Sequence, residues 1–117
     1  MQTLTTTIKR QWLALIIDGS KKVEYREIKP YWQERLVKYA VPFKLRMING
    51  MDKNAPEVTV LVNKVDIGYQ TDRATLRASG DLEEGHVFRL NIAKVLSYKN
   101  WDKKRGIPSQ RRTDRSR

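Results

Sequence analysis

The chain has 117 residues, which is enough for one domain whose core needs no metal ion or disulfide to fold. It contains no cysteine, which excludes a thiol nucleophile, a disulfide and a zinc site built on cysteine. Its single histidine, His86, excludes chemistry that needs two histidines within one monomer. We therefore expect a protein without a metal ion or cofactor.

The net charge of +11 is unevenly distributed along the chain. Residues 99–117 contain eight lysines and arginines and two aspartates, so this segment carries +6 and the preceding residues carry +5. Positive charge attracts phosphate and favours nucleic-acid binding, although a basic surface also serves solubility alone. The only sizeable apolar residues of this segment are Trp101 and Ile107, so we expect a mobile basic tail after a domain over residues 1–98.

The hydropathy of the chain indicates a protein that does not engage a membrane. No apolar run approaches the roughly 18 residues of a membrane span. Residues 1–10 lack the apolar stretch of a secretion signal, and the absence of cysteine fits a reducing compartment. We expect a cytoplasmic protein, and the sequence leaves its oligomeric state open.

The first part of the chain predicts a strand followed by a helix. Residues 3–8 are rich in β-branched side chains, which favour a strand. Residues 9–18 have apolar side chains at helical spacing, and Gly19 suits the left-handed position just after a helix. The apolar face of this helix is expected to contain Ile8, Trp12, Leu15 and Ile16.

Residues 22–28 predict a second strand that is unusually rich in charge. Strict alternation directs Val23 and Tyr25 toward the core. The opposite, open face is expected to carry Lys22, Glu24 and Arg26. Lys21 reaches the side of Glu24 only if it still belongs to the preceding turn.

The rest of the chain predicts a second helix and three further strands. Pro30 begins a helix over residues 30–39. Residues 42–48, 57–67 and 86–98 alternate or are rich in β-branched side chains, whereas 68–85 are irregular with a weak helical signal over 72–78. The residues expected to face the core are Trp32, Leu36, Tyr39, Phe43, Leu45 and Met47. Residues 57–67 have Val58, Val60 and Val62 on one side and Leu61, Val65 and Ile67 mostly on the other, which indicates a central strand or one covered by a helix. Phe88, Leu90 and Ile92 share one face of 86–98. The pattern predicts an α+β fold, a small, mostly antiparallel β-barrel with two flanking helices.

The turn and strand after the first helix contain a motif. Gly19, Lys21, Glu24 and Arg26 have the order Gly-x-Lys-x-x-Glu-x-Arg, which resembles the signature of the ASCH domain family. With the flanking pattern, the resemblance covers about residues 3–98. It is strongest over residues 9–38, which look like the short phage and bacterial members. It implies a PUA-like β-barrel with a cleft between barrel and helices that takes RNA or a nucleotide.

Some ASCH proteins are hydrolases, including amidohydrolases of acetylated cytidine and ribonucleases. In the amidohydrolase branch the lysine of the motif is catalytic, and it matches Lys21. This sequence has Glu24 where that branch has threonine. The branch has its catalytic glutamate in a later segment, for which Glu83 and Glu84 are candidates.

Three functions follow from these residues. The first is RNA or nucleotide binding, with cations on phosphate or base edges and aromatic rings stacked on bases. The second is hydrolysis with Lys21 and Glu24 as catalytic residues, which requires a lowered lysine pKa that Glu24 opposes. The third is an interaction protein in which Glu24 and Arg26 only form a surface ion pair. The candidate ligand-binding residues are Trp12, Lys21, Lys22, Glu24, Tyr25, Arg26 and Trp32.

Overall fold

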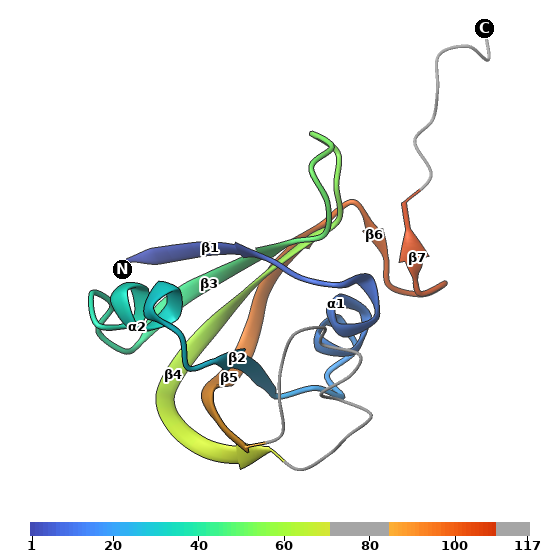
Figure 1. The fold of residues 1–117 in the computed structure, drawn as a ribbon. Coiled ribbons are helices and arrows are strands. Elements are labelled where there is room, and N and C mark those ends of the chain that lie inside the picture. The colour runs from blue at the N-terminus through green and yellow to red at the C-terminus, as the bar shows by residue number, and fades with distance from the viewer. Residues whose placement is uncertain (71–84, 110–117) are drawn as a thin grey trace, which may run out of the picture.

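The computed structural model describes residues 1–70 and 85–109 and shows an α+β fold (Figure 1). Two short helices and seven strands follow the chain in the order β1 (Thr3–Thr7), α1 (Arg10–Ile17), β2 (Val23–Glu27), α2 (Pro30–Leu36), β3 (Phe43–Ile48), β4 (Glu57–Gln70), β5 (Gly85–Lys99), β6 (Trp101–Asp102) and β7 (Ile107–Pro108). The α+β class expected from the sequence is confirmed, and the five predicted strands and two predicted helices are all present.

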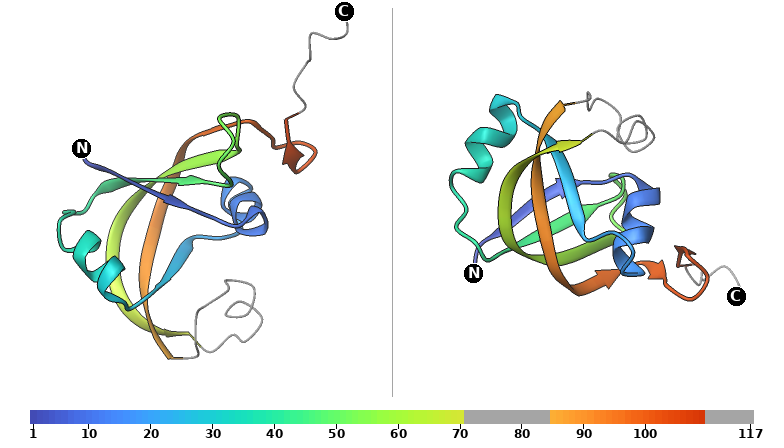
Figure 2. Two further views of the ribbon diagram at one scale, coloured as in Figure 1. Left: turned by 45° about the horizontal axis from the view of Figure 1, so that its top comes forward. Right: turned by 90° about the horizontal axis from the view of Figure 1, so that it is seen from below.

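The five longer strands form one strongly curled sheet. Their order is β1-β3-β4-β5-β2, with β1 and β3 parallel and the other pairs antiparallel. The ladder between β4 and β5 has register shifts near Val60 and Val62, and such bulges increase the bend and twist of a sheet. The curl brings the two edge strands, β1 and β2, toward each other, so the sheet is a half-barrel (Figure 2).

The core fills the concave side of this sheet. Alternate residues of β3 point inward, as the sequence predicted, because a strand buried on one face alternates with a period of two. Strand β4, which is apolar on both sides, is the central strand of the sheet, and Val58, Val60 and Val62 are its buried side. The fully buried side chains are Leu13, Phe43, Leu45, Met47, Val58, Val60, Val62 and Leu90. Burying each of the larger ones contributes about 1.5–3 kcal/mol to folding.

Both helices pack their apolar side chains on this core, with small differences from the prediction. In α1 the buried residues are Leu13, Ile16 and Ile17, whereas Trp12 and Leu15 are only partly buried. Gly19 has the predicted positive φ, 89°, directly after the helix. Helix α2 begins at Pro30 as predicted and ends at Leu36, three residues early, and it buries Trp32.

The expected mobile tail is wrong for residues 99–109. Lys99 is the last residue of β5, and the following β6 and β7 pair as a small hairpin. Trp101 is only 6% exposed and belongs to the hydrophobic core, so a single large side chain fixes the hairpin to the half-barrel. Asn100 adopts a positive φ of 58° at the bend and donates from Nδ2 to the Ala55 carbonyl. The composition of this segment predicted mobility wrongly, because burial of the single Trp101 indole stabilises the docked hairpin although its neighbours are polar.

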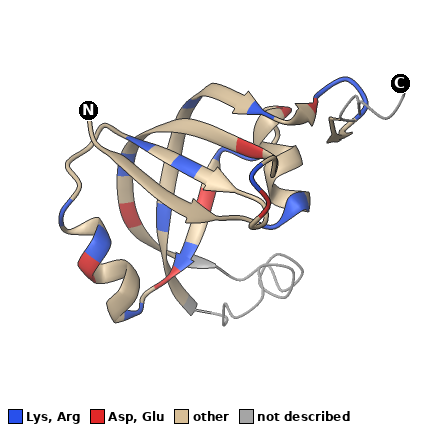
Figure 3. Ribbon diagram, turned by 90° about the horizontal axis from the view of Figure 1, so that it is seen from above, with Lys and Arg blue, Asp and Glu red and all other residues tan. Residues whose placement is uncertain are grey.

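The hairpin loop presents a run of basic side chains to solvent. Lys103, Lys104 and Arg105 are exposed, and Figure 3 shows their loop as blue ribbon at the rim of the molecule. The rest of the predicted tail, residues 110–117, lies outside the described residues, as do the weak helical signal over 72–78 and the candidates Glu83 and Glu84. None of the helices in the described ranges is both long and apolar enough to cross a membrane.

Trp101→Ala tests whether the hairpin is part of the folded domain. Truncating a buried tryptophan to alanine costs about 3–5 kcal/mol, because apolar contacts are lost and a cavity remains. We expect a loss of this size in urea unfolding. Ile107→Ala is the matched control in the same hairpin, because Ile107 is 37% exposed, and its effect should be much smaller. Equal, small effects of the two substitutions would mean that the hairpin is not docked.

Candidate functional site

A pocket of about 440 Å³ opens where the two edges of the sheet approach. Its walls come from three segments: the end of β1 with the start of α1, strand β2, and the start of α2 with the residues just before it. The lining residues are Thr7, Ile8, Lys9, Trp12, Glu24, Tyr25, Arg26, Glu27, Lys29, Tyr31 and Trp32. The pocket therefore combines aromatic rings with both signs of charge.

Strand β2 presents its faces differently from the prediction. The sequence placed Glu24 on an open face and Val23 and Tyr25 in the core, but Glu24 is 5% exposed while Val23 and Tyr25 are only partly buried. Alternation assigned the charged face to solvent, because burying a carboxylate is costly unless cations pair with it. Here Lys21 and Arg26 supply that pairing, so the charged face of β2 turns inward at the end of the half-barrel.

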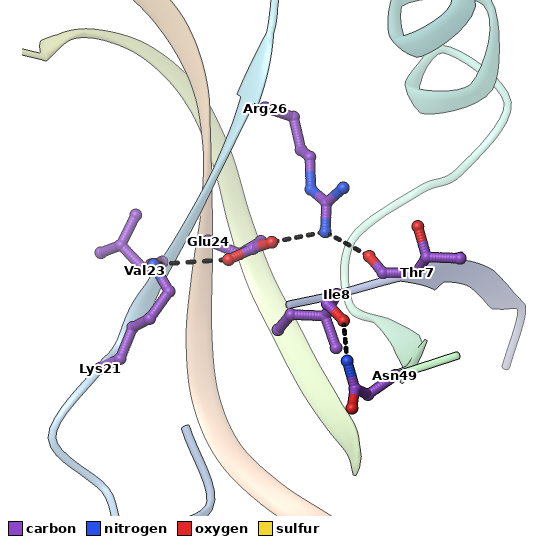
Figure 4. A network of polar contacts seen from close by, with 7 residues as sticks. All are labelled: Thr7, Ile8, Lys21, Val23, Glu24, Arg26 and Asn49. Carbon is purple, nitrogen blue, oxygen red and sulfur yellow. Dashed lines mark hydrogen bonds and ion pairs between the residues drawn. The ribbon is translucent and has the colours of Figure 1, made fainter. Parts of the chain in front are cut away.

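The Glu24 carboxylate lies between two cations (Figure 4). Its Oε2 accepts a hydrogen bond of 2.5 Å from Nη2 of Arg26, and its Oε1 lies 3.4 Å from Nζ of Lys21. The same Nη2 of Arg26 donates to the Thr7 carbonyl at 2.9 Å. Arg26 therefore links β2, one edge of the sheet, to the end of β1, the other edge.

The Asn49 side chain and one backbone hydrogen bond hold the end of β1 in place. The Ile8 amide donates to the Ile48 carbonyl at 3.1 Å, and Nδ2 of Asn49 donates to the Ile8 carbonyl at 2.9 Å. Both contacts attach the β1–α1 connection to the end of β3, and Figure 4 shows the one from Asn49. The carbonyl that Arg26 uses is thus part of a fixed backbone, which makes the pocket wall well defined.

Lys21 is buried beside the pocket with its charge satisfied. Its Nζ donates to the Val23 carbonyl at 2.6 Å and lies 4.8 Å and 5.3 Å from the ring centroids of Tyr25 and Trp12. Burial lowers the pKa of Lys21 below its ordinary value of 10.5, and the neighbouring Glu24 carboxylate partly offsets the shift. Lys21 does not line the pocket, so its role there is to hold Glu24 and the aromatic rings.

Four aromatic side chains line the pocket, and two of them form a corner. The rings of Tyr31 and Trp32 meet edge to face with centroids 5.6 Å apart, and the Arg26 guanidinium lies 5.0 Å from the Trp32 centroid. Cation–π contacts of this kind stabilise the position of both partners. Trp12 and Tyr25 approach from α1 and β2, where they also contact Lys21.

Hydrogen-bond donors remain on two lining side chains. Nε1 of Trp12 and Nε of Arg26 are buried and have no hydrogen-bond partner within residues 1–70 and 85–109. Buried donors are normally paired, because an unpaired one loses its interaction with water without compensation. These two N–H groups are closed off from the empty pocket, so it is the Glu24 and Arg26 side chains in its wall that suit a polar ligand better than a purely apolar one.

The structure brings together most of the predicted site residues. Lys21, Glu24 and Arg26 form one ion-pair cluster, and Trp12, Tyr25 and Trp32 line the adjoining pocket. Lys22 is exposed and does not line it. The sequence did not predict the remaining lining residues, which are Thr7, Ile8, Lys9, Glu27, Lys29 and Tyr31. Only proximity to the motif could have indicated Glu27, Lys29 and Tyr31; nothing in the sequence indicated Thr7, Ile8 and Lys9.

The part of the chain described by the structure holds no group of three or more histidine, aspartate or glutamate side chains suited to a metal ion. Comparison with models of protein families, with curated proteins and with solved structures found no match to this chain.

Arg26→Leu tests the buried ion pair. Removing one partner leaves the Glu24 carboxylate buried with only Lys21, so we expect a loss of about 3 kcal/mol in the free energy of unfolding. Replacing both partners, as in Glu24→Leu with Arg26→Leu, removes the uncompensated charge and should restore part of the loss. A double variant as unstable as the sum of the two single variants would contradict a direct coupling.

Lys21→Met tests the burial of the Lys21 ammonium group. The folded pKa lies below the unfolded value of 10.5, so between these two values the unfolded state binds more protons and stability rises with pH. Methionine does not titrate, so the variant should lose this alkaline rise in urea unfolding. Lys22→Met, at the exposed neighbour, is the matched control and should retain it. If the free energy of unfolding depended on pH equally in the two variants, the assignment to Lys21 would be contradicted.

Proposed function

We propose that this protein binds RNA or a nucleotide and that the pocket beside Glu24 and Arg26 holds a base. The observation that carries the proposal is the pocket itself, in which four aromatic rings surround a buried carboxylate–guanidinium pair. A volume of about 440 Å³ lies in the range of small-molecule sites. Unstacked bases are typically recognised by aromatic stacking combined with hydrogen bonds to their edges.

The charged pair supplies both kinds of hydrogen-bonding group that a base edge requires. A carboxylate has about four acceptor positions, so Glu24 retains some for an exocyclic amine after pairing with Lys21 and Arg26. Within the described residues Arg26 makes its hydrogen bonds through Nη2, so its Nη1 group remains to donate to a ligand. The pair can therefore accept from and donate to the same flat ligand.

The cations around the pocket favour a ligand that carries phosphate. Lys9 and Lys29 add two ammonium groups to the wall, where Nζ of Lys29 pairs with Glu27 at 2.8 Å, and the whole chain has a charge of +11. Phosphate contacts contribute affinity that does not depend on sequence, while the base contacts select the ligand. The resemblance of Gly19, Lys21, Glu24 and Arg26 to the ASCH signature supports the same class, and we propose that the half-barrel is PUA-like.

Tyr31→Ala provides the sharpest test of the pocket. Tyr31 is 51% exposed, so its removal should leave stability almost unchanged. Loss of one stacking ring typically costs about 1–3 kcal/mol of binding free energy. We expect a loss of this size for nucleoside monophosphates and for short single-stranded RNA, measured by calorimetry.

Tyr98→Ala is the matched control for this experiment. Tyr98 is a tyrosine of similar exposure, 40%, on β5 and does not line the pocket. Its substitution should leave nucleotide affinity unchanged. Equal losses for the two variants, or no nucleotide binding by the wild-type protein, would overturn the proposed function. Arg26 is less suitable for this purpose, because it also stabilises the buried Glu24.

Hydrolysis of a modified nucleoside is the second candidate, and the lowered pKa of Lys21 favours it. A lysine nucleophile must lose its proton, and a reduced pKa makes this easier. Against this, Nζ of Lys21 donates to the Val23 carbonyl, lies beside Glu24, and is absent from the pocket wall. Turnover of N4-acetylcytidine by the wild type that disappears in Lys21→Arg would establish the hydrolase; binding without turnover would exclude it for this substrate.

A further inference from the structure

We infer that the loop of the β6–β7 hairpin is a second, pre-formed contact surface for the phosphate backbone of single-stranded RNA, about one helix length from the pocket. The inference rests on the proposed RNA binding and adds a site that the pocket does not include. Its residues are Lys103, Lys104 and Arg105, which are consecutive and exposed. They form the turn between β6 and β7.

The loop is held in one conformation by its own backbone contacts. The Arg105 amide donates to Oδ1 of Asp102 at 3.0 Å, and the Gly106 amide donates to the Asp102 carbonyl at 2.7 Å. Gly106 has a positive φ of 69°, which glycine adopts without the strain that a side chain would add. The Asp102 carboxylate thus accepts a hydrogen bond from the loop backbone, and the three cations are exposed to solvent.

The hairpin is also fixed relative to the half-barrel. Trp101, the first residue of β6, is buried in the core, and the Ser109 amide closes the base of the hairpin by donating to the Asn100 carbonyl at 3.1 Å. A rigid group of cations loses less conformational entropy on binding than a mobile tail would. This anchoring makes the loop a surface with a defined position.

Helix α1 connects the pocket to the loop. Its first turn contributes Lys9 and Trp12 to the pocket wall, and its other end lies beside the hairpin (Figures 1 and 2). Hydrogen bonds from Ser20 lower the pKa of Asp18, just after α1, and the nearby Lys103 contributes to the shift. Eight helical residues span about 12 Å at 1.5 Å per residue. An RNA strand with one base in the pocket can therefore follow α1 to the loop within a few nucleotides.

A polyanion is the partner that this surface fits. Three adjacent exposed cations match the repeated charge of a phosphate backbone. Lys22, which does not line the pocket, is exposed in the connection between α1 and β2.

The test replaces Lys103, Lys104 and Arg105 together by glutamine in the full chain. The probe is an oligouridine RNA of about 20 nucleotides, longer than the roughly 4–16 nucleotides that one small barrel domain covers. Losing three phosphate contacts should reduce the slope of log affinity against log salt by about 2. The wild type should then lose about 20-fold more affinity than the variant between about 50 and 200 mM salt.

The matched control replaces Lys44, Lys64 and Lys94 by glutamine, which removes the same charge from exposed positions on β3, β4 and β5. This control should retain the wild-type slope, as should Lys103→Arg with Lys104→Arg. Equal changes in the two glutamine triples would mean that only net charge matters, and an unchanged slope in the loop variant would likewise overturn the inference. Loss of binding to phosphatidylserine vesicles, with an unchanged RNA slope, would reassign the loop to membranes.

A mononucleotide separates this inference from the proposed function. It is too short to reach from the pocket to the loop, so its affinity should be the same in the loop variant and the wild type. If the wild type binds the RNA but no mononucleotide, the pocket proposal fails while the salt slope still tests the loop. If the loop variant loses mononucleotide affinity, the loop is not a separate site.

Discussion

The arrangement of the site depends on the buried carboxylate of Glu24. Removing an ionised carboxylate from water costs several kcal/mol, so it is stable inside a protein only when cations and hydrogen bonds replace the water. Arg26 and Lys21 provide that replacement from either side of Glu24. Because the same Nη2 of Arg26 also binds the Thr7 carbonyl, neutralising Glu24 simultaneously ties β2 to the end of β1. The Arg26 side chain thus joins the two edges of the sheet.

This linkage explains why the pocket lies where it does. Its walls come from segments that are distant in sequence, and the Glu24–Arg26–Thr7 contacts set the separation of two of them. The ligand recognition that we propose therefore uses the same groups as stability, which is common at functional sites, where local rules for burial are broken and compensated by neighbours. A substitution in the ion pair changes both properties, whereas the exposed rings of the pocket affect mainly the ligand.

The C-terminal hairpin shows how one apolar side chain changes the role of a basic segment. Without Trp101 in the core, the cations after β5 would belong to a flexible basic segment. With it, Lys103, Lys104 and Arg105 have a fixed place at the end of α1. The pocket therefore includes the start of α1, and the charged loop lies near the other end of this helix.

The sequence by itself determined the local elements and most of the core. Periodicity located the helices and strands, and alternation identified Phe43, Leu45 and Met47 as buried, because these positions belong to a strand with one apolar face. The cluster of Lys21, Glu24 and Arg26 was also accessible from sequence, since these residues are close neighbours in the chain and their contacts are local.

The tertiary structure alone decided which face of β2 is buried, since burial of Glu24 depends on cations and on a carbonyl from β1. It also decided that Thr7, Ile8 and Lys9 join the pocket, because the curl of a five-stranded sheet brings its edges together and no local spacing encodes that curl. The docking of Trp101 has the same origin. Its polar neighbours indicated a mobile segment, and only the shape of the finished core provides the space that the indole fills.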